Sequence, residues 1–347
     1  MPTVINGTTG ITTDAINATS GNTSLTTLNV ASNAISAVNS LGFRNRIING
    51  AMVIDQRNNG ASVSVVDNYT IDRWAAARFG GAATMTAQRS TVAPAGFTNS
   101  LLFTIGTGAT PTGTDQTFTE QRIEGFNIYD LGWGTSAAQA VTVSFWVRSS
   151  VTGTYGLTAR NSANNRAYVA SYTVSAANTL EYKTVTIPGD TSGTWAVDNV
   201  TGFRIMWDLG AGPTYSQAAG SWTSGSLISG LTGGVKLVST SGATFYITGV
   251  QLEAGTVASP FERRDYGREF IMCQRYYEVT NWVVTTDGAN GAYQNIGSWQ
   301  VTKRTTPTMV TDTGAGGSFV AVGSSGFRQD TNPSAFTGVF IRGSAEL

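Results

Sequence analysis

Histidine is absent from the 347 residues of this chain. Without histidine one chain can build neither Ser-His-Asp nor Cys-His catalytic sites, nor the common zinc sites. There is a single cysteine, Cys273, so no intrachain disulfide can form. No glycine-rich loop carries the lysine that cradles phosphate groups. We therefore expect neither an enzyme nor a cofactor, and we assign no catalytic or metal-binding residue.

Charge is scarce and balanced. Charged residues make up 12% of the chain, with 21 basic and 21 acidic side chains. Binding to nucleic acid relies on an excess of basic groups, so we expect no nucleic-acid partner. No run approaches the roughly 18 apolar residues of a membrane span, which predicts no membrane insertion. The first residues lack the basic and apolar regions of a secretory signal, so we expect synthesis in a cytoplasm.

What is abundant is threonine, serine, valine and glycine, a composition typical of β-sheet. Residues 138–150 alternate strictly: apolar side chains at 141, 143, 145 and 147 fall on one face, and Thr142, Ser144, Trp146 and Arg148 on the other. Residues 180–190, 201–210, 243–255 and 100–108 are further expected strands. Long polar loops join them in place of amphipathic helices. This pattern predicts an all-β protein with an antiparallel jelly-roll sandwich.

The chain divides into an N-terminal segment (1–42), a β-sandwich (43–263) and a small C-terminal β module (264–347) that opens with a short helix within 266–280. The N-terminal segment has no aromatic residue and too little apolar surface to order itself. Leu28, Ala31, Ile35 and Val38 have heptad-like spacing, which predicts a short three-stranded coiled coil there. The earlier residues 4–13 are expected to be extended chain. The alternative is a flexible leader, because the intervening Asn and Ser residues are mediocre helix formers.

Residues 261–278 hold an unusual share of the charge. Arginines pair bidentately with carboxylates and stack on rings, as a junction between two modules requires. An acid/base site at Glu262 or Glu269 is the alternative, although neighbouring arginines lower carboxyl pKa values and so disfavour a general acid. We assign the run to the domain junction, with Glu262, Arg263, Arg264, Arg268, Glu269 and Arg275 as its residues.

Several segments resemble the tail-fibre proteins of tailed bacteriophages and prophages with a jelly-roll body. They are RNRIINGAMVIDQR, YTIDRW, VTVSFWVRSSVTGTYGL, LEYKTVTIPGDTSGTW, TFYITGVQLEAGTVASPFERRDYGREFIMCQRYYE and TKRTTPTMV. The resemblance implies a body like a carbohydrate-binding module, a homotrimer and a place in the virion. It also implies that residues 1–42 dock to other phage proteins and that the body contacts host-surface polysaccharide.

Sugar binding requires outward-pointing aromatic rings and polar groups. We expect Trp74, Trp146, Trp195 and Trp207 in the core, because they lie in or beside strands. Tyr215 and Trp222 lie in a loop of small residues, and Arg160 and Asn165 on an expected hairpin tip. Trp282, Tyr293 and Arg328 lie in the last module. These seven are our candidate carbohydrate-binding residues, with ordinary packing or subunit contact as the alternative for each.

Two other functions stay open. One is a structural fibre that decorates the capsid or tail without a specific ligand. The other is a polysaccharide depolymerase, since glycoside cleavage needs only two carboxylates, here drawn from Asp115, Glu120 and Glu124. A structural calcium ion is chemically allowed at Asp190 and Asp198, because oxygen ligands suffice for calcium.

Overall fold

The computed structural model describes residues 28–30, 33–35, 43–284, 296–311, 319–329 and 337–347. The chain forms two compact units, residues 1–42 and residues 43–347. In the first unit, strands β1 (Leu28–Val30) and β2 (Asn33–Ile35) pair antiparallel, with Leu28 opposite Ile35. Extended chain therefore replaces the helical stripe expected at these two positions, as suits a segment rich in Asn and β-branched residues. Ala31 and Val38 lie outside the described residues, and the oligomerisation role of all four stays a prediction.

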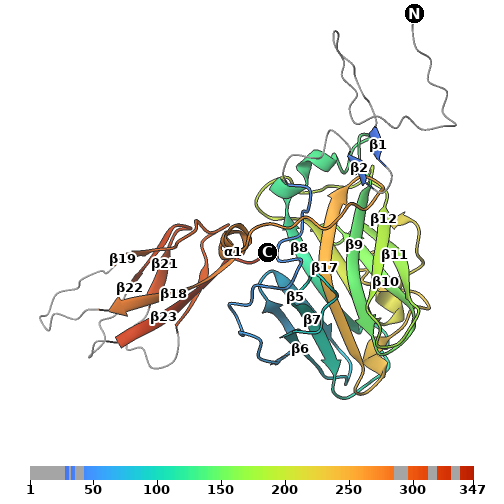
Figure 1. Cartoon of the computed structure of the whole chain (residues 1–347), viewed down its shortest axis with the longest axis horizontal. Helices are drawn as coiled ribbons and strands as arrows, with labels where there is room; N and C mark the ends of the chain where they lie inside the picture. Colours follow the sequence, from blue (N-terminus) through green and yellow to red (C-terminus); the bar gives the residue numbers. More distant parts are fainter. Residues whose placement is uncertain (1–27, 31–32, 36–42, 285–295, 312–318, 330–336) are drawn as a thin grey trace, which may run out of the picture. The chain divides into compact units, whose positions relative to one another are not determined.

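A sandwich of two antiparallel sheets forms the body of the second unit (Figure 1). One sheet has the order β12-β9-β17-β7-β6-β3 and the other β15-β11-β10-β13-β8-β5-β4. The expected all-β jelly-roll class is confirmed. The strands of the first sheet are β3 (Val63–Ser64), β6 (Met85–Ser90), β7 (Ser100–Ile105), β9 (Val141–Ser149), β12 (Glu181–Ile187) and β17 (Thr244–Ala254). Those of the second are β4 (Asp67–Ile71), β5 (Trp74–Phe79), β8 (Gln116–Glu124), β10 (Gly153–Arg160), β11 (Ala167–Val174), β13 (Thr201–Ala211) and β15 (Trp222–Thr223).

Short elements complete the connections. The parallel pair β14 (Ser216–Gln217) and β16 (Gly230–Leu231) lies in the long loop after β13. Four single 3-10 turns fill the other bends: η1 (Gly125–Asn127), η2 (Tyr129–Leu131), η3 (Pro213–Tyr215) and η4 (Leu237–Ser239).

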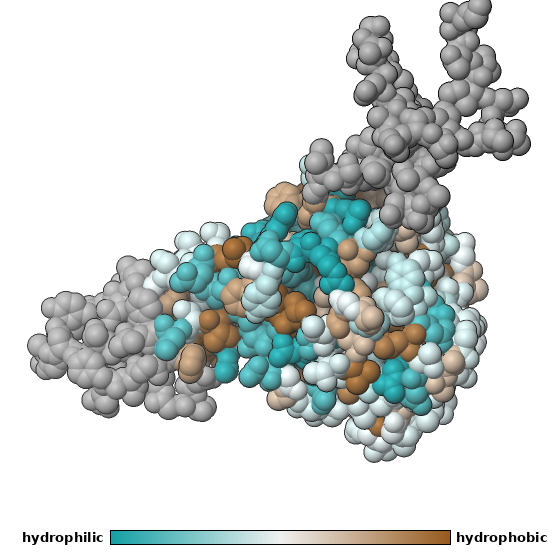
Figure 2. All heavy atoms as spheres, in the orientation of Figure 1, coloured by the Kyte–Doolittle hydropathy of each residue, from teal (hydrophilic) through white to brown (hydrophobic). Residues whose placement is uncertain are grey.

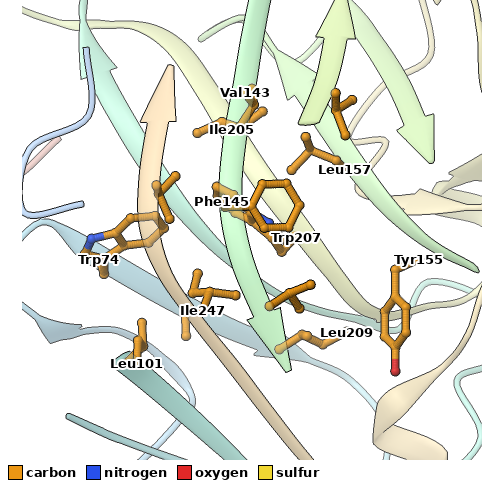
Figure 3. Packing of buried hydrophobic residues seen from close by; sticks show 14 of the residues in the cluster. Trp74, Leu101, Val143, Phe145, Tyr155, Leu157, Ile205, Trp207, Leu209 and Ile247 are labelled. Carbon is orange, nitrogen blue, oxygen red and sulfur yellow. The ribbon is translucent and has the colours of Figure 1, made fainter. Parts of the chain in front are cut away.

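The core lies between the two sheets and follows from the alternation of each strand. On β9, Val143 and Phe145 are fully buried and face the opposite sheet. Phe145 meets Trp207 of β13 edge-on at 5.5 Å, and Trp207 lies 5.5 Å from Trp74 (Figure 3). Such aromatic contacts add to the free energy gained by burying apolar area. Of the outward side chains on β9, Thr142 and Ser144 are buried, whereas Trp146 and Arg148 are half-buried.

The C-terminal strands make two small sheets of their own, with orders β18-β23-β20 and β19-β22-β21. Their bounds are β18 (Tyr277–Val284), β19 (Ile296–Ser298), β20 (Thr308–Thr311), β21 (Phe319–Val322), β22 (Gly326–Gln329) and β23 (Thr337–Ser344). Helix α1 (Tyr266–Gln274) precedes them, capped by the Asp265 side chain, which accepts from the Arg268 N–H at 2.9 Å. The helix ends at Gln274, six residues before the limit of 280 that the sequence predicted. Aromatic and β-branched residues after 275 favour the strand that forms there.

The described surface mixes hydrophobic and hydrophilic residues, which are interspersed over the face drawn in Figure 2. In the part of the chain that the structure describes, no helix has the length and apolar character needed to cross a bilayer.

Candidate functional site

Four aromatic side chains and one arginine form a continuous row on the outer side of the first sheet. Tyr182 of β12 lies directly opposite Trp146 of β9, with ring centroids 5.5 Å apart. Phe97, in the loop before β7, meets Phe261 edge-on at 5.1 Å. The Arg263 guanidinium lies over Phe97 at 4.7 Å. We call these five residues the aromatic face.

A glycine joins the two halves of the aromatic face. Gly249 lies in the irregular stretch of β17, between Thr248 and Gln251, with a left-handed φ of +60°. A Cβ atom there would lie 2.7 Å from the Phe97 ring and 3.1 Å from Trp146. Both rings therefore rest on the backbone of β17. A larger residue at position 249 would push the two rings apart. This contact makes one row out of segments that are distant in the sequence.

A cavity of about 180 Å³ lies at one end of the aromatic face. Phe261 and Arg263 belong to both, and Tyr266, Glu262 and Glu269 are among the other lining residues. The volume is below the roughly 300–1,000 Å³ of pockets for drug-sized ligands. A cavity of this size can hold at most one small chemical group.

The charged run beside this cavity is fixed by contacts within the chain. Glu262 accepts from the Asn45 N–H at 2.6 Å. Arg264 pairs with Glu269 at 3.2 Å and donates to the carbonyl oxygen of Ile47 at 2.9 Å. These bonds tie the strand-like segment after residue 43 to the chain entering α1.

Arg275 continues this linkage by pairing with Glu124 of β8 at 2.9 Å, which joins the end of α1 to the sandwich. Arg268 is exposed on α1. Arg263 lies on the aromatic face. The run therefore divides into groups that hold the chain together and groups that point outward.

Arg160 lies elsewhere than the sequence predicted. It is the last residue of β10, 2% exposed, and its Nη1 donates to the carbonyl oxygen of Ile228 at 3.2 Å. Burial, with Arg204 nearby, lowers its pKa to about 9. The segment after β15 covers it, which strand alternation could not reveal. Asn165 is exposed on the turn between β10 and β11, where it accepts from the Asn161 amide at 2.8 Å.

Trp222 is held by packing and is not a free ring. It meets Trp133 at 5.4 Å and Trp195 at 5.6 Å, and its indole N–H donates to the carbonyl oxygen of Pro188 at 2.9 Å. Tyr215 is half-buried at the end of η3. The loop of small residues that suggested exposure folds back over the sandwich edge. Neither side chain belongs to the aromatic face.

The candidates in the last module are only partly described. Trp282 lies in β18, but its side chain is outside the described residues, as is all of Tyr293. Arg328 lies in β22, half-buried, and has an interaction partner. Their carbohydrate-binding role stays a prediction.

The aromatic face was missed although part of its signal was visible. Trp146 was expected in the core with Trp74, Trp195 and Trp207, and those three are buried. Alternation nevertheless put Trp146 on the polar side of β9, and Tyr182 falls on the matching side of β12. Only the pairing of β9 with β12, which a single sequence does not give, brings the two rings together.

The carboxylates considered for glycoside cleavage are already engaged in hydrogen bonds or ion pairs within the chain. Glu120 is fully buried on β8; burial alone would raise its pKa, but Arg204 and Arg122 together lower it. Arg204 binds it bidentately at 2.6 and 2.7 Å. Asp115 accepts from the Thr112 N–H at 2.8 Å. A carboxyl group kept ionised is poorly suited to act as the general acid.

The aspartates considered for calcium are bonded to other groups. Both oxygens of Asp190 accept from the Arg166 guanidinium, at 2.6 and 2.7 Å. Asp198 accepts from the Val200 N–H at 3.2 Å. Within the described ranges no cluster of three or more His, Cys, Asp or Glu side chains could hold a metal ion. The calcium ion stays a prediction.

No protein-family model and no curated protein matches this chain. Solved structures with similarity include the enzymatically active domain of tailspike protein 4 of bacteriophage CBA120, at 12% identity and TM-score 0.32, over 61% of this chain and 21% of that one. A family 11 carbohydrate-binding module of Clostridium thermocellum matches at 16% identity and TM-score 0.28, over 58% and 98%. A putative sugar-binding protein of Bacteroides thetaiotaomicron matches at 11% and 0.34, over 61% and 100%. At these values neither ligand nor activity transfers to this chain.

Proposed function

We propose that the chain is a glycan-binding subunit of a phage fibre, which holds host-surface polysaccharide on the aromatic face of its sandwich. The observation that carries the proposal is the row formed by Tyr182, Trp146, Phe97 and Phe261, outward of a packed sheet. Tyr182 is 45% exposed. A pyranose ring offers an apolar face to such rings, and exposed Thr184 and Thr186 on β12 supply hydroxyl groups beside them.

The virion setting rests on the sequence resemblance to phage tail fibres. In this proposal the subunit is a homotrimer that docks to the particle through residues 1–42. It binds without cleaving, since Glu120 and Glu124 are engaged by arginines.

Removal of either ring of the Trp146–Tyr182 pair tests the proposal. We expect Trp146→Ala and Tyr182→Ala to weaken glycan binding about tenfold each, because an aromatic contact contributes roughly 1.4 kcal/mol when it is lost with its buried area. The measurement is binding of the full-length protein to a glycan array, followed by titration of the best ligand.

Tyr129→Ala is the matched control, because Tyr129 is 64% exposed on η2 and is not part of the aromatic face. Equal binding by all three variants would refute the aromatic face as the site. A wild-type protein that binds no glycan would favour the structural fibre without ligand. Release of reducing sugar ends from polysaccharide would favour the depolymerase.

A further inference from the structure

Two outward arginines beside the aromatic rings have no acidic partner. Arg148 follows Trp146 on the same side of β9, and Arg263 lies over Phe97. Neither forms an ion pair with any carboxylate in the described segments, although ion pairs are frequent in this protein. The positive charge on this surface is therefore uncompensated.

Both guanidinium groups are held in place before any ligand arrives. Arg148 lies 4.9 Å from the Tyr246 ring and donates from Nε to the carbonyl oxygen of Asn178 at 2.8 Å. Arg263 donates from Nη2 to the carbonyl oxygen of Gly96 at 2.6 Å. Stacking on a ring and one hydrogen bond fix the plane of each group and leave further N–H donors free. A preorganised donor loses little conformational entropy on binding.

Other cations near the aromatic face, unlike Arg148 and Arg263, are already paired with carboxylates. Arg264 pairs with Glu269, and Arg44 lies 3.8 Å from Glu253. Glu269 and Glu253 thus pair with other cations and Asp265 caps α1, whereas the two stacked arginines have no carboxylate partner in the described segments.

We infer that the glycan bound by the aromatic face is acidic, with carboxylate groups on its sugars that pair with Arg263 and Arg148. A planar carboxylate matches the fork of a guanidinium bidentately, with stronger hydrogen bonds than a neutral hydroxyl makes. The rings then bind the apolar faces of the sugars between the charged contacts. This inference rests on the proposed glycan-binding function and adds the chemical class of the ligand.

The test compares acidic glycans with neutral counterparts on the full-length protein. Probes are an array of uronic-acid, sialic-acid and sulfated glycans with their neutral analogues, then the best carboxylated ligand before and after chemical reduction of its carboxyl groups to alcohols. We expect reduction to weaken binding about tenfold or more and added salt to weaken binding of the acidic form.

The variants are Arg263→Gln and Arg148→Gln, with Arg268→Gln as control, because Arg268 is an exposed arginine of α1 and is not part of the aromatic face. We expect Arg263→Gln and Arg148→Gln each to weaken binding about tenfold. The control should bind as the wild-type protein does. Arg263→Lys should keep the salt dependence but lose part of the affinity, since it keeps the charge without the fork. Thermal unfolding of each variant checks that the fold is intact.

The outcomes separate the two proposals. The protein could bind neutral glycans in a way that depends on Trp146 but on neither arginine. That result would overturn the inference that the ligand is acidic, and the proposed glycan binding would stand. Preference for sulfated over carboxylated glycans would overturn the inference that the acidic groups of the ligand are carboxylates. Absence of any binding that depends on Trp146 would overturn both.

Discussion

At the scale of single residues, Asp72 shows how burial controls a charge. It lies in the tight turn between β4 and β5 and is fully buried. Its carboxylate accepts from the backbone N–H and the side-chain amide of Gln56, at 2.6 and 2.7 Å. Burial nevertheless raises its pKa from 3.8 to about 6, against the lowering effect of Arg57 and of these bonds. The folded protein therefore binds this proton more tightly than the unfolded chain does.

The stability that Asp72 contributes therefore decreases as the pH rises. The stabilisation from protonated Asp72 is fully present below about pH 4 and is lost as the pH rises through about 6, a change of about 3 kcal/mol in the free energy of unfolding. Asp72→Asn should remove this component. Denaturant unfolding of both proteins at pH 4 and pH 7 gives the difference, and parallel pH profiles would contradict the prediction.

At the scale of elements, a buried ion pair supports the C-terminal strands. Lys303 and Glu278, at the start of β18, are both fully buried and paired. Lys303 also donates to the carbonyl oxygen of Gln274, the last residue of α1, at 2.6 Å. Glu278 accepts from the Gln300 N–H at 2.9 Å. The pair thus links the helix to the sheet that follows it.

Loss of one partner should be costly. Lys303→Met keeps the side-chain length but leaves a buried carboxylate without its cation, so we expect the free energy of unfolding to fall by about 3–5 kcal/mol. The double variant Lys303→Met, Glu278→Gln should recover part of this loss, because no charge is then buried. Chemical denaturation of the three proteins measures both effects; a double variant no better than the single one would contradict this account.

Elements were predicted better than contacts between them. Alternation placed β9 and β12 and assigned their faces, because period-two patterning depends on local sequence alone. The end of α1 was placed too late, because its continuation is a strand that pairs with β23 far along the chain. Phe97 and Phe261 meet only through the fold, so the aromatic face had no local signature as a unit. Arg160 was misplaced for the same reason, since a distant loop buries it.

At the scale of the whole molecule, the two compact units divide the expected tasks. We expect the full chain to be a trimer and residues 43–347 alone to be a monomer, because that unit has its own core and oligomerisation is assigned to residues 1–42. Analytical ultracentrifugation of both proteins measures their masses. A trimeric 43–347 fragment would move the oligomerisation surface to the body, and a monomeric full chain would refute the trimer.

The contacts of Glu346 have a consequence for biosynthesis. Its carboxylate pairs with Arg57 and with the buried Arg73, a residue 273 positions earlier. During translation Arg73 leaves the ribosome long before its partner does, so this ion pair can form only after nearly all of this sequence has been made. A product that ends before Glu346 would leave Arg73 without this carboxylate, so we expect it to be less stable than the full sequence.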